Sequence, residues 1–528
     1  MITPEIKKAL SHYFHTMKKP VTVVLQTGEH AKRAELVSFL GKICELSANL
    51  VFQERETHGA LRSPVSFTLE VDGAATGIVF SGIPGGHEFN SLILAILQAA
   101  GADMKLDASI QALIREVREP LRFETFISLS CHNCPDVVQA LNQFALLNPG
   151  ISAEMIDGGV FPALIKERDI QGVPAVFLNG ELFATGKVDA AVLLDKLIER
   201  HPAMARNGGQ PALPLQDVTV IGGGPAGVAA AIYSARKGLK VTLIGERLGG
   251  QVKDTMGIEN LISVPSTTGP QLAGNLQAHL GEYEVTVKEH LRVTGVEAGN
   301  VKRVTLSSGE VIETRALIVA TGARWRELGV PGEKENIGNG VAYCPHCDGP
   351  FFKGRDVAVI GGGNSGIEAA LDLAGIVRSV TVFEYLPHLK ADQVLVDQAI
   401  ARDNITIVTN AATRQIVADN GKVVGIEYED RATGEIKRDE LAGVFIQIGL
   451  LPNSQVVADL VETKPWGEIV INEKCETSVP GIYACGDVTT VPYKQIVIAM
   501  GEGAKASLAA FEYLLMHEVE TTATAQAA

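Results

Sequence analysis

Two similar stretches, VTVIGGGPAG at residues 218–227 and VAVIGGGNSG at residues 357–366, decide the fold of the larger part of this chain. In each, four mostly apolar residues predict a buried strand, and the glycines after them predict a tight turn into a helix. A second strand follows each helix and ends at an acidic residue, Glu246 in the first copy and Glu384 in the second. Helix N–H groups at such a turn hold a pyrophosphate, and an acid at this distance accepts a ribose hydroxyl. The stretches therefore predict two dinucleotide-binding units of Rossmann type in an α/β protein.

The residues expected to contact the two ligands are those of the glycine loops and the two acids. They are Gly222, Gly224, Pro225, Ala226, Gly227 and Glu246 in the first unit, and Gly361, Gly363, Asn364, Ser365, Gly366 and Glu384 in the second. Beside Glu384, Tyr385 and Leu386 offer no cation for a 2′-phosphate, so the second site is expected to prefer NADH over NADPH. His388 and Lys390 are the residues that would overturn this preference.

Two Cys-x-x-Cys pairs form the other strong signal, CHNC at residues 131–134 and CPHC at residues 344–347. Cys131 follows an apolar strand and is expected to begin a helix, whose positive end lowers the pKa of a thiol. Cys134 lies one turn on and can resolve a mixed disulfide. Pro174 is expected to form the cis-proline turn that faces such a pair in a thioredoxin or glutaredoxin fold. The alternative is a shared zinc site, but the two pairs lie far beyond the roughly 15–20 residues of zinc ribbons, and no metal is expected.

The first 196 residues contain a weak internal repeat. In each copy an apolar strand leads into a helix, and a proline later opens a hairpin with an Asp-Gly or Asn-Gly turn. Only the second copy carries the Cys-x-x-Cys pair, and Thr27 and His30 are expected to stand where its cysteines would be. We therefore predict two tandem thioredoxin-like folds, over residues 1–101 and 102–196, followed by a linker at 197–214.

Composition and charge narrow the function classes. The net charge of −15 argues against nucleic-acid binding, which needs clusters of Lys and Arg. No apolar run approaches the roughly 20 residues of a membrane helix, and the first residues are not followed by a signal-peptide pattern. A cytoplasmic location without membrane contact is therefore expected. In that compartment a paired Cys-x-x-Cys performs redox or metal chemistry.

The carboxyl-terminal part resembles the low-molecular-weight thioredoxin reductases. The resemblance rests on CPHCDG at residues 344–349, just before the second glycine loop, on ATG at 320–322 and on ACGD at 484–487. It implies an FAD domain at 215–328 and 447–520, interrupted by an NAD domain at 329–446 that carries the dithiol. The further FAD contacts that it implies are Gln251, Thr321, Gly322, Gly486, Asp487, Lys494, Gln495 and Ile496.

The same resemblance implies a role for each residue of the second dithiol. Cys347 would lie nearest the flavin, Cys344 would exchange outward, and Asp348 would be the general acid that protonates the leaving thiolate. The chain departs from thioredoxin reductases at Glu384, where that family uses basic residues to read NADPH, and in its amino-terminal extension.

These two departures resemble the flavoprotein subunit of bacterial alkyl hydroperoxide reductase, over essentially the whole chain. The resemblance implies FAD as cofactor, NADH as cosubstrate, a homodimer, and a two-cysteine peroxiredoxin as partner. Electrons are expected to pass from NADH through FAD and the Cys344/Cys347 pair to the Cys131/Cys134 pair and then to the partner. The chain has no Pro-x-x-x-Thr-x-x-Cys motif, so the peroxide-reducing sulfur is expected in the partner.

Three alternatives stay open beside this function. They are a reductase of free thioredoxin-like proteins or small disulfides, an NADH-binding redox sensor or scaffold, and an NADH oxidase that passes electrons to oxygen. The lone cysteines Cys44, Cys475 and Cys485 are expected to be buried apolar residues.

Overall fold

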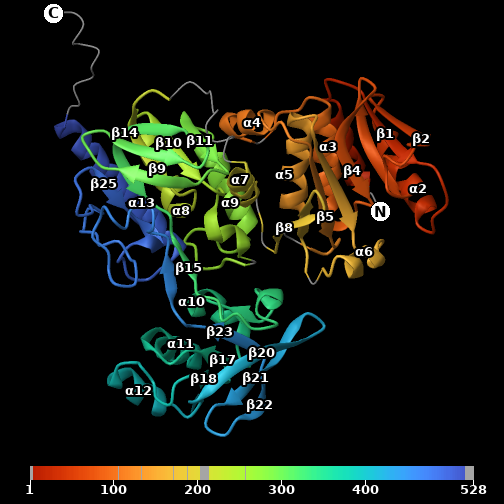
Figure 1. The fold of residues 1–528 in the computed structure, drawn as a ribbon. Helices are drawn as coiled ribbons and strands as arrows, with labels where there is room; N and C mark the ends of the chain where they lie inside the picture. The colour runs from red at the N-terminus through yellow and green to blue at the C-terminus, as the bar shows by residue number, and fades with distance from the viewer. Residues whose placement is uncertain are drawn as a thin grey trace, which may run out of the picture. The chain divides into compact units, whose positions relative to one another are not determined.

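The structure is a computed structural model that describes residues 4–104, 106–131, 134–170, 172–186, 188, 190–201, 213–255 and 257–517, apart from the side chains of Asp254 and Cys347. The chain divides into two compact units (Figure 1). The first comprises Met1–Leu213, Lys288–Thr294 and Thr305–Ile312, and the second comprises Pro214–Val287, Gly295–Val304 and Glu313–Ala528.

The first unit contains an eight-stranded sheet with the order β2-β1-β3-β4-β6-β5-β7-β8. Its strands are β1 (Val21–Gln26), β2 (Leu50–Arg55), β3 (Ser66–Val71), β4 (Ala74–Ser81), β5 (Leu121–Ile127), β6 (Ile151–Asp157), β7 (Ala175–Leu178) and β8 (Glu181–Thr185). Its helices are α1 (Pro4–Phe14), α2 (Arg33–Cys44), η1 (Gly86–Glu88), α3 (Phe89–Ala99), α4 (Ala108–Arg115), α5 (Cys134–Leu147), α6 (Pro162–Glu167) and α7 (Ala190–Arg200).

This sheet consists of two copies of one motif. In the first copy β1 pairs parallel with β2 and antiparallel with β3, which forms a hairpin with β4. In the second copy β5 pairs parallel with β6 and antiparallel with β7, which forms a hairpin with β8. Both hairpins turn on two residues with positive φ, Asp72-Gly73 and Asn179-Gly180, as two-residue hairpin turns require. The predicted repeat is therefore confirmed, and the parallel pairing of β4 with β6 joins the copies.

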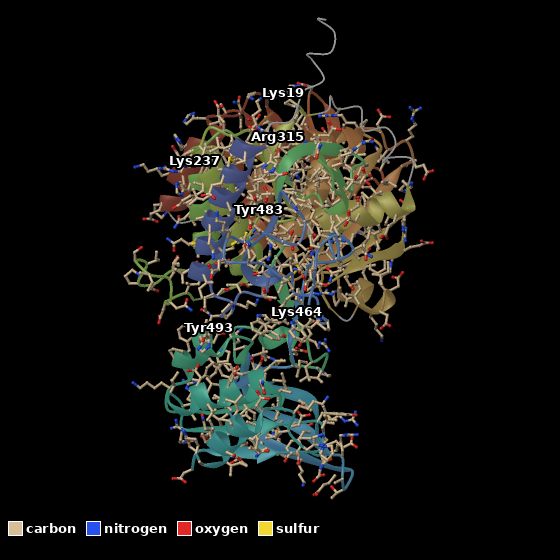
Figure 2. All side chains as sticks on the ribbon, turned by 90° about the vertical axis from the view of Figure 1, so that its left-hand side faces the viewer. Lys19, Lys237, Arg315, Lys464, Tyr483 and Tyr493 are labelled. Atoms are coloured by element: carbon tan, nitrogen blue, oxygen red, sulfur yellow. A yellow bond between two sulfur atoms is a disulfide. The ribbon has the colours of Figure 1, made fainter. Side chains whose placement is uncertain are left out.

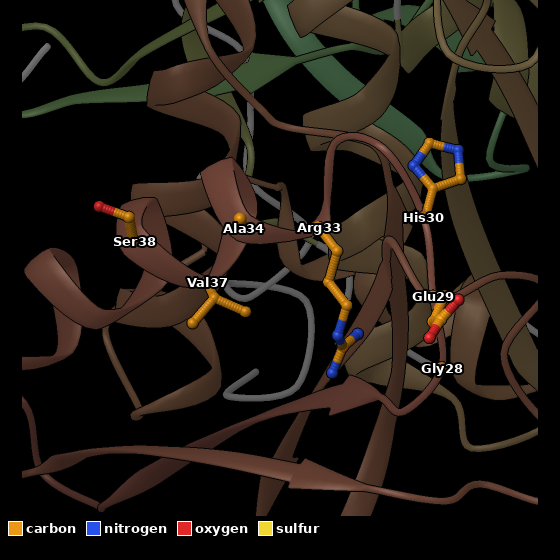
Figure 3. A pocket seen from close by; sticks show the side chains of 7 residues that line it. All are labelled: Gly28, Glu29, His30, Arg33, Ala34, Val37 and Ser38. Atoms are coloured by element: carbon orange, nitrogen blue, oxygen red, sulfur yellow. The ribbon is translucent and has the colours of Figure 1, made fainter.

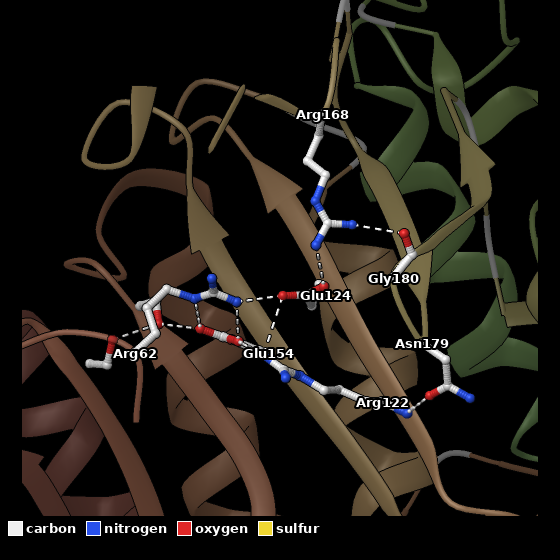
Figure 4. A network of polar contacts seen from close by, with 9 residues as sticks. Arg62, Arg122, Glu124, Glu154, Arg168, Asn179 and Gly180 are labelled. Atoms are coloured by element: carbon white, nitrogen blue, oxygen red, sulfur yellow. Dashed lines mark hydrogen bonds and ion pairs between the residues drawn. The ribbon is translucent and has the colours of Figure 1, made fainter. Parts of the chain in front are cut away.

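An ion network ties the two copies together (Figure 4). Arg62, from the loop after β2, donates from Nη2 to Glu154 Oε2 at 2.7 Å and also pairs with Glu124. Both carboxylates belong to the second copy, and their side chains are less than a tenth exposed. Ser81 of the first copy donates to Glu154 at 2.6 Å. Because a buried carboxylate without a cation is costly, the network makes each copy depend on the other.

The second unit contains two sheets of Rossmann type. In the first, the order is β11-β10-β9-β14-β13-β12, with β25 on β14, and β9 pairs parallel with both β10 and β14. Tyr483 of β25 is buried in the core of this sheet and its helices (Figure 2). The elements are β9 (Gln216–Ile221), α8 (Pro225–Ala235), β10 (Val241–Gly245), η3 (Gly250–Asp254), α9 (Gly269–Leu280), β11 (Val285–Glu289), β12 (Val293–Glu297), β13 (Lys302–Leu306), β14 (Val311–Val319), β25 (Ile482–Ala484), η6 (Gly486–Val488) and α13 (Ile496–Met516).

The second sheet of this unit is parallel, with the order β16-β23-β17-β18-β19. A three-stranded antiparallel sheet, β20-β21-β22, follows β19 in the chain, and β15 pairs with β24 where the chain enters and leaves the inserted part. The elements are β15 (Ala323–Trp325), η4 (Lys334–Asn336), β16 (Val341–Ala342), α10 (Pro345–Asp348), η5 (Gly349–Phe352), β17 (Asp356–Ile360), α11 (Asn364–Ala374), β18 (Ser379–Phe383), α12 (Gln393–Ile400), β19 (Ile405–Val408), β20 (Ala411–Asp419), β21 (Lys422–Asp430), β22 (Glu435–Glu440), β23 (Gly443–Ile446) and β24 (Leu450–Pro452).

One predicted boundary is wrong. The linker was expected to begin at residue 197, but α7 continues to Arg200, because Leu193, Leu194 and Leu197 form one buried face of the helix. Residues 202–212 of the predicted linker lie outside the described residues. Among the described helices, none is long and apolar enough to cross a membrane.

Candidate dinucleotide and dithiol sites

The first glycine loop joins β9 to α8 and has no room for side chains at two positions. A Cβ on Gly222, whose φ is +120°, would lie 2.1 Å from the carbonyl oxygen of Ala320, and one on Gly227 would lie 1.8 Å from that of Gly222. A Cβ on Gly224, at the N-cap of α8, would meet nothing within 4 Å. The loop is thus packed tightly against the sheet on one side and open at the helix N-terminus. That arrangement fits a pyrophosphate bound by the first N–H groups of α8.

The other residues predicted to bind FAD are distributed over several segments of this domain. Thr321 donates to the carbonyl of Asn453 at 2.7 Å, and Gly322 and Gly486 both have positive φ. Burial raises the pKa of Asp487, and Lys494 partly offsets this effect. Ala226 is buried and Pro225 is half-buried, Glu246 and Gln251 are exposed, and Ile496 begins α13. The glycine loop and the segment at Asp487 therefore come from opposite ends of one domain, and the donor set fits a dinucleotide.

The second glycine loop repeats this geometry between β17 and α11. A Cβ on Gly361 would lie 2.5 Å from the carbonyl oxygen of Gln447, and one on Gly366 would lie 1.9 Å from that of Gly361. Gly363 again caps the helix and opens onto empty space. Asn364 is held by Asp392, to which it donates at 3.0 Å, and Ser365 is exposed. This loop also fits a pyrophosphate.

Glu384 follows β18 and is buried, although it carries a carboxylate. Its Oε2 accepts a hydrogen bond from Gly362 N at 2.6 Å, and its Oε1 accepts one from Leu386 N at 2.8 Å. The carboxylate is therefore fixed beside the glycine loop, where an adenosine ribose would lie in a Rossmann unit.

A cation near Glu384 was missed by the sequence analysis. Arg431 lies 47 residues after Glu384 in the chain, yet its guanidinium carbon is 3.9 Å from the ring centroid of Tyr385. Arg431 is not among the residues next to Glu384 on which the expected preference for NADH was based, and that preference stays a prediction. No local sequence signal predicts this contact, because β21 and the loop after β18 are brought together by the tertiary fold.

The second dithiol lies at a short helix. Cys344 is the N-cap residue of α10 and is disulfide-bonded, whereas the side chain of Cys347 lies outside the described residues. The side-chain amide nitrogen of Gln495, a residue expected at the flavin, is 4.0 Å from Cys344 Sγ. Burial raises the pKa of Asp348 to about 6, and a hydrogen bond from the backbone of Cys344 opposes the rise. A carboxyl with such a pKa is partly protonated near neutral pH and can donate a proton there.

The first dithiol is a disulfide between Cys131 and Cys134, whose Cα atoms are 5.6 Å apart. Cys134 is buried and Cys131 is half-buried, so Cys131 is the accessible sulfur. The Val173–Pro174 peptide bond is cis, as predicted, and Cys131 Sγ lies 3.8 Å from the carbonyl oxygen of Val173. Cys131 itself is not helical, and α5 is described from Cys134 onward, so the expectation that Cys131 begins the helix is wrong.

The matching place in the first copy carries other residues than predicted. Gln26 and Ile127 end the two strands, and Arg33 and Cys134 begin the two helices, an offset of 101 residues at both places. His30 and Arg33 therefore stand where Cys131 and Cys134 stand, and the expectation of Thr27 and His30 was shifted by three residues. Figure 3 shows this region, a hollow of about 510 Å³ lined by Gly28, Glu29, His30, Arg33, Ala34, Val37 and Ser38.

A buried acid near the first dithiol was also missed. Glu88 of η1 is 0 % exposed, and burial raises the pKa of its carboxyl to about 7. The backbone N–H of the preceding residue, His87, donates to Leu129, two residues before Cys131. Nothing in the sequence around Glu88 distinguishes it from an ordinary exposed glutamate before a helix.

The three lone cysteines are buried, as predicted. Burial raises the pKa of Cys44 to about 12 and also raises the pKa of Cys475 and Cys485. These thiols are therefore protonated and unreactive. Among the described residues, no group of three His, Cys, Asp or Glu side chains could hold a metal ion.

Two family models match the chain. Residues 216–503 match the pyridine nucleotide-disulphide oxidoreductase model, and residues 122–199 match a thioredoxin domain model. The alkyl hydroperoxide reductase F subunit of Escherichia coli is 48% identical over 522 residues, covering 98% of this chain and 99% of that protein. Its Pseudomonas aeruginosa counterpart is 48% identical over 520 residues, with the same coverage. A Bacillus subtilis protein named NADH dehydrogenase is 45% identical over 515 residues, again covering 98% and 99%.

Solved structures resemble somewhat more than half of the chain. Thioredoxin reductase from Streptococcus pyogenes is 36% identical with a TM-score of 0.55 and covers 57% of this chain and 99% of its own. The enzyme from Giardia duodenalis is 28% identical with a TM-score of 0.56, covering 58% and 100%. The identity to the F subunits extends over nearly the full length of both chains. The two glycine loops and the two Cys-x-x-Cys pairs agree with this relationship. The chain therefore belongs to the alkyl hydroperoxide reductase F-subunit family of pyridine nucleotide-disulphide oxidoreductases.

Proposed function

We propose that this enzyme is an NADH-dependent disulfide reductase that uses FAD and delivers electrons to a two-cysteine peroxiredoxin. The electrons would travel through the Cys344/Cys347 pair and then the Cys131/Cys134 pair, in support of alkyl hydroperoxide and hydrogen peroxide detoxification. The observation that carries this proposal is the 4.0 Å approach of Gln495, a predicted flavin contact, to Cys344 Sγ. The disulfide at Cys131 supports a second relay centre.

The glycine loops and the acids would bind and orient the two dinucleotides. Glu384 would accept a ribose hydroxyl of NADH, and Asp487 would bind the ribitol of FAD. When bound, FAD supplies the conversion of two-electron hydride chemistry into reduction of a disulfide.

Asp348 would supply the proton that the second dithiol needs. When the Cys344–Cys347 disulfide opens, one sulfur leaves as a thiolate, and a protonated Asp348 would donate its proton to that thiolate. Its pKa of about 6 leaves part of the carboxyl protonated at neutral pH.

The relay between the dithiols would proceed by thiol–disulfide exchange. The thiolate of Cys344 would attack Cys131, breaking the Cys131–Cys134 bond and forming a mixed disulfide. Cys347 would then attack Cys344, releasing Cys131 and restoring the Cys344–Cys347 disulfide. Two electrons leave the second pair and two enter the first, so the step balances.

Direct sulfur contact at each step implies domain movement. We propose that the inserted domain at residues 329–446 swings between two orientations, and that the amino-terminal copies swing between the second dithiol and the partner. An engineered crosslink across residues 197–214 should abolish partner reduction and spare reduction of the flavin by NADH. Unimpaired turnover of the crosslinked protein would refute the movement.

Anaerobic titration with NADH tests the electron path. One flavin and two disulfides take up about six electrons per chain, since each centre accepts two. Replacing both Cys131 and Cys134 by Ser should lower the uptake to about four electrons. Uptake of only two electrons by the unmodified protein would contradict the relay.

Two other activities are separated by the same variants. A reductase of free thioredoxin-like proteins or small disulfides would keep normal reduction of its acceptor without Cys131. The Bacillus subtilis relative is named NADH dehydrogenase, and this name favours a second alternative, direct electron transfer from the flavin to another acceptor such as oxygen. Neither dithiol would take part in that reaction. Fast multiple turnover with a disulfide acceptor would exclude a redox sensor or scaffold. A homodimer is proposed from the family resemblance and is testable by sedimentation.

A further inference from the structure

Arg431 is a cation of the inserted domain that is held by stacking. Its guanidinium lies over Tyr385, and Nη1 donates to the carbonyl oxygen of Tyr385 at 2.8 Å. Among the described residues, no carboxylate forms an ion pair with it. Three other cations of this domain are each paired, in Arg378–Asp356, Arg414–Glu429 and Lys437–Asp430. The charge of Arg431 is therefore left available to a ligand.

Backbone hydrogen bonds fix the position of Arg431. The backbone N–H of Arg431 donates to the carbonyl oxygen of Asn410 at 2.7 Å, and the backbone N–H of Asn410 donates to the carbonyl oxygen of Leu386 at 2.9 Å. The N–H of Ala411 donates to the carbonyl oxygen of Glu384 at 2.9 Å. These bonds fix the backbone of Arg431 against the segment that carries Glu384. The stack on Tyr385 fixes its guanidinium.

One peptide group separates the guanidinium from the Glu384 carboxylate. The carbonyl oxygen of this peptide, on Tyr385, accepts from Arg431 Nη1 at 2.8 Å, and its N–H, on Leu386, donates to Glu384 Oε1 at 2.8 Å. Because the oxygen and nitrogen of a peptide lie about 2.3 Å apart, Nη1 is at most about 8 Å from Oε1. A phosphate on a ribose hydroxyl bound at Glu384 spans such a distance.

We propose that Arg431 is a latent 2′-phosphate-binding cation of the dinucleotide site, and that the charge of Glu384 prevents it from accepting NADPH. This inference rests on the proposed assignment of the second glycine loop to NADH. A 2′-phosphate beside the buried Glu384 carboxylate would meet a like charge that is screened little by water. Without that carboxylate, Nε and Nη2 of Arg431, which bond no described residue, can donate to phosphate oxygens, the geometry that arginine provides best.

Calorimetric titration of the full-length holoenzyme with two fragments tests the inference. Adenosine 2′,5′-bisphosphate carries the 2′-phosphate, and adenosine 5′-phosphate lacks it. Glu384→Ser should tighten binding of the bisphosphate by about tenfold, the size of one charge-assisted hydrogen bond, and change binding of the monophosphate far less. Adding Arg431→Ala to Glu384→Ser should remove that gain.

Arg414→Ala is the matched control, because Arg414 is an exposed arginine of the same domain that is already paired with Glu429. In the Glu384→Ser background it should leave the gain intact. A gain that survives the loss of Arg431, or that disappears instead with Lys390→Ala or His388→Ala, would overturn the inference. So would the absence of any gain in a Glu384→Ser protein that melts normally.

A second variant protects the test from misfolding. Glu384→Gln removes the charge and keeps a side-chain oxygen for one of the two backbone N–H bonds, so a smaller gain that also depends on Arg431 is expected. Bleaching of the flavin by NADH is measured separately on the unmodified protein. Its failure would refute the proposed function, while the fragment titrations would still decide the role of Arg431.

Discussion

The two copies of the amino-terminal motif share one strand order and one turn chemistry, yet they differ at the loop between the first strand and its helix. In the second copy this loop holds Cys131 and leads to Cys134. In the first copy His30 and Arg33 take these places, and Arg33 donates from Nη1 to the carbonyl oxygens of Gln26 and Pro64. The first copy thus has an arginine that bonds backbone carbonyls at the place where the second copy has a disulfide. Both kinds of side chain are compatible with the fold of this loop, but only cysteines can perform the proposed thiol–disulfide exchange.

The largest effect is expected from removing Cys131, the more accessible sulfur of the second copy. Cys131→Ala should lower reduction of a peroxiredoxin disulfide by at least about 100-fold, because the remaining thiol, Cys134, is buried and cannot reach the partner to form the mixed disulfide. Reduction of the flavin by NADH should be unchanged in stopped-flow absorbance. Partner reduction at the normal rate in Cys131→Ala would show that the second copy does not need this sulfur. The difference between the two copies would then have no role in electron transfer.

The dependence of one copy on the other is tested at Arg62. Arg62→Ala leaves the Glu124 and Glu154 carboxylates without their cation, although Arg122 and Arg168 lie within 4 Å of them at the edge of the network. We expect the free energy of unfolding of the amino-terminal unit to fall by about 3 kcal/mol. Chemical denaturation measures this loss. Arg118→Ala is the control, since among the described residues Arg118 makes only an exposed pair with Glu116. An equal loss in both variants would contradict a coupling between the copies.

The buried acid of the first copy should make stability depend on pH. The pKa of Glu88 is raised from 4.5 to about 7, so the folded state binds a proton that the unfolded state has lost between these values. Stability therefore falls as pH rises from about 4.5 to 7 and stays low above 7. Glu88→Gln should raise the free energy of unfolding by up to about 3 kcal/mol at pH 8 and leave it nearly unchanged at pH 4.

Denaturation of both proteins across this pH range measures the difference. Glu35→Gln is a suitable control, because Glu35 is exposed on α2 and Lys32 is its only ion-pair partner in the described part of the chain. A pH-independent difference for Glu88→Gln would mean that its carboxyl is ionised in the folded protein.

The smallest effect is expected at the place in the first copy that matches Cys131. The His30 ring accepts a hydrogen bond at Nδ1 from Lys32 N at 3.1 Å. His30→Ala should therefore leave peroxiredoxin reduction within about twofold of normal, measured beside Cys131→Ala in the same assay. A loss comparable to that of Cys131→Ala would give the first copy a part in electron transfer.

Features carried by short motifs could be predicted from the sequence. The glycine loops, the Cys-x-x-Cys pairs and the cis peptide before Pro174 depend on a few neighbouring residues, because backbone sterics and helix N-termini act locally. The repeat was also predictable, since both hairpin turns need residues that tolerate positive φ. The alignment of the two copies was predictable only to within three residues, because no motif marks the point where α2 begins.

By itself, the sequence determined two dinucleotide-binding units, two dithiols and a repeated thioredoxin-like motif, since each follows from local spacing and hydrophobic pattern. Only the tertiary structure decided which side chains meet across those units. Arg62 reaches two glutamates of the other copy, Arg431 stacks beside Glu384, and Glu88 is buried with a raised pKa. The physical reason is that burial and charge pairing depend on residues distant in the chain, and a local pattern does not record them.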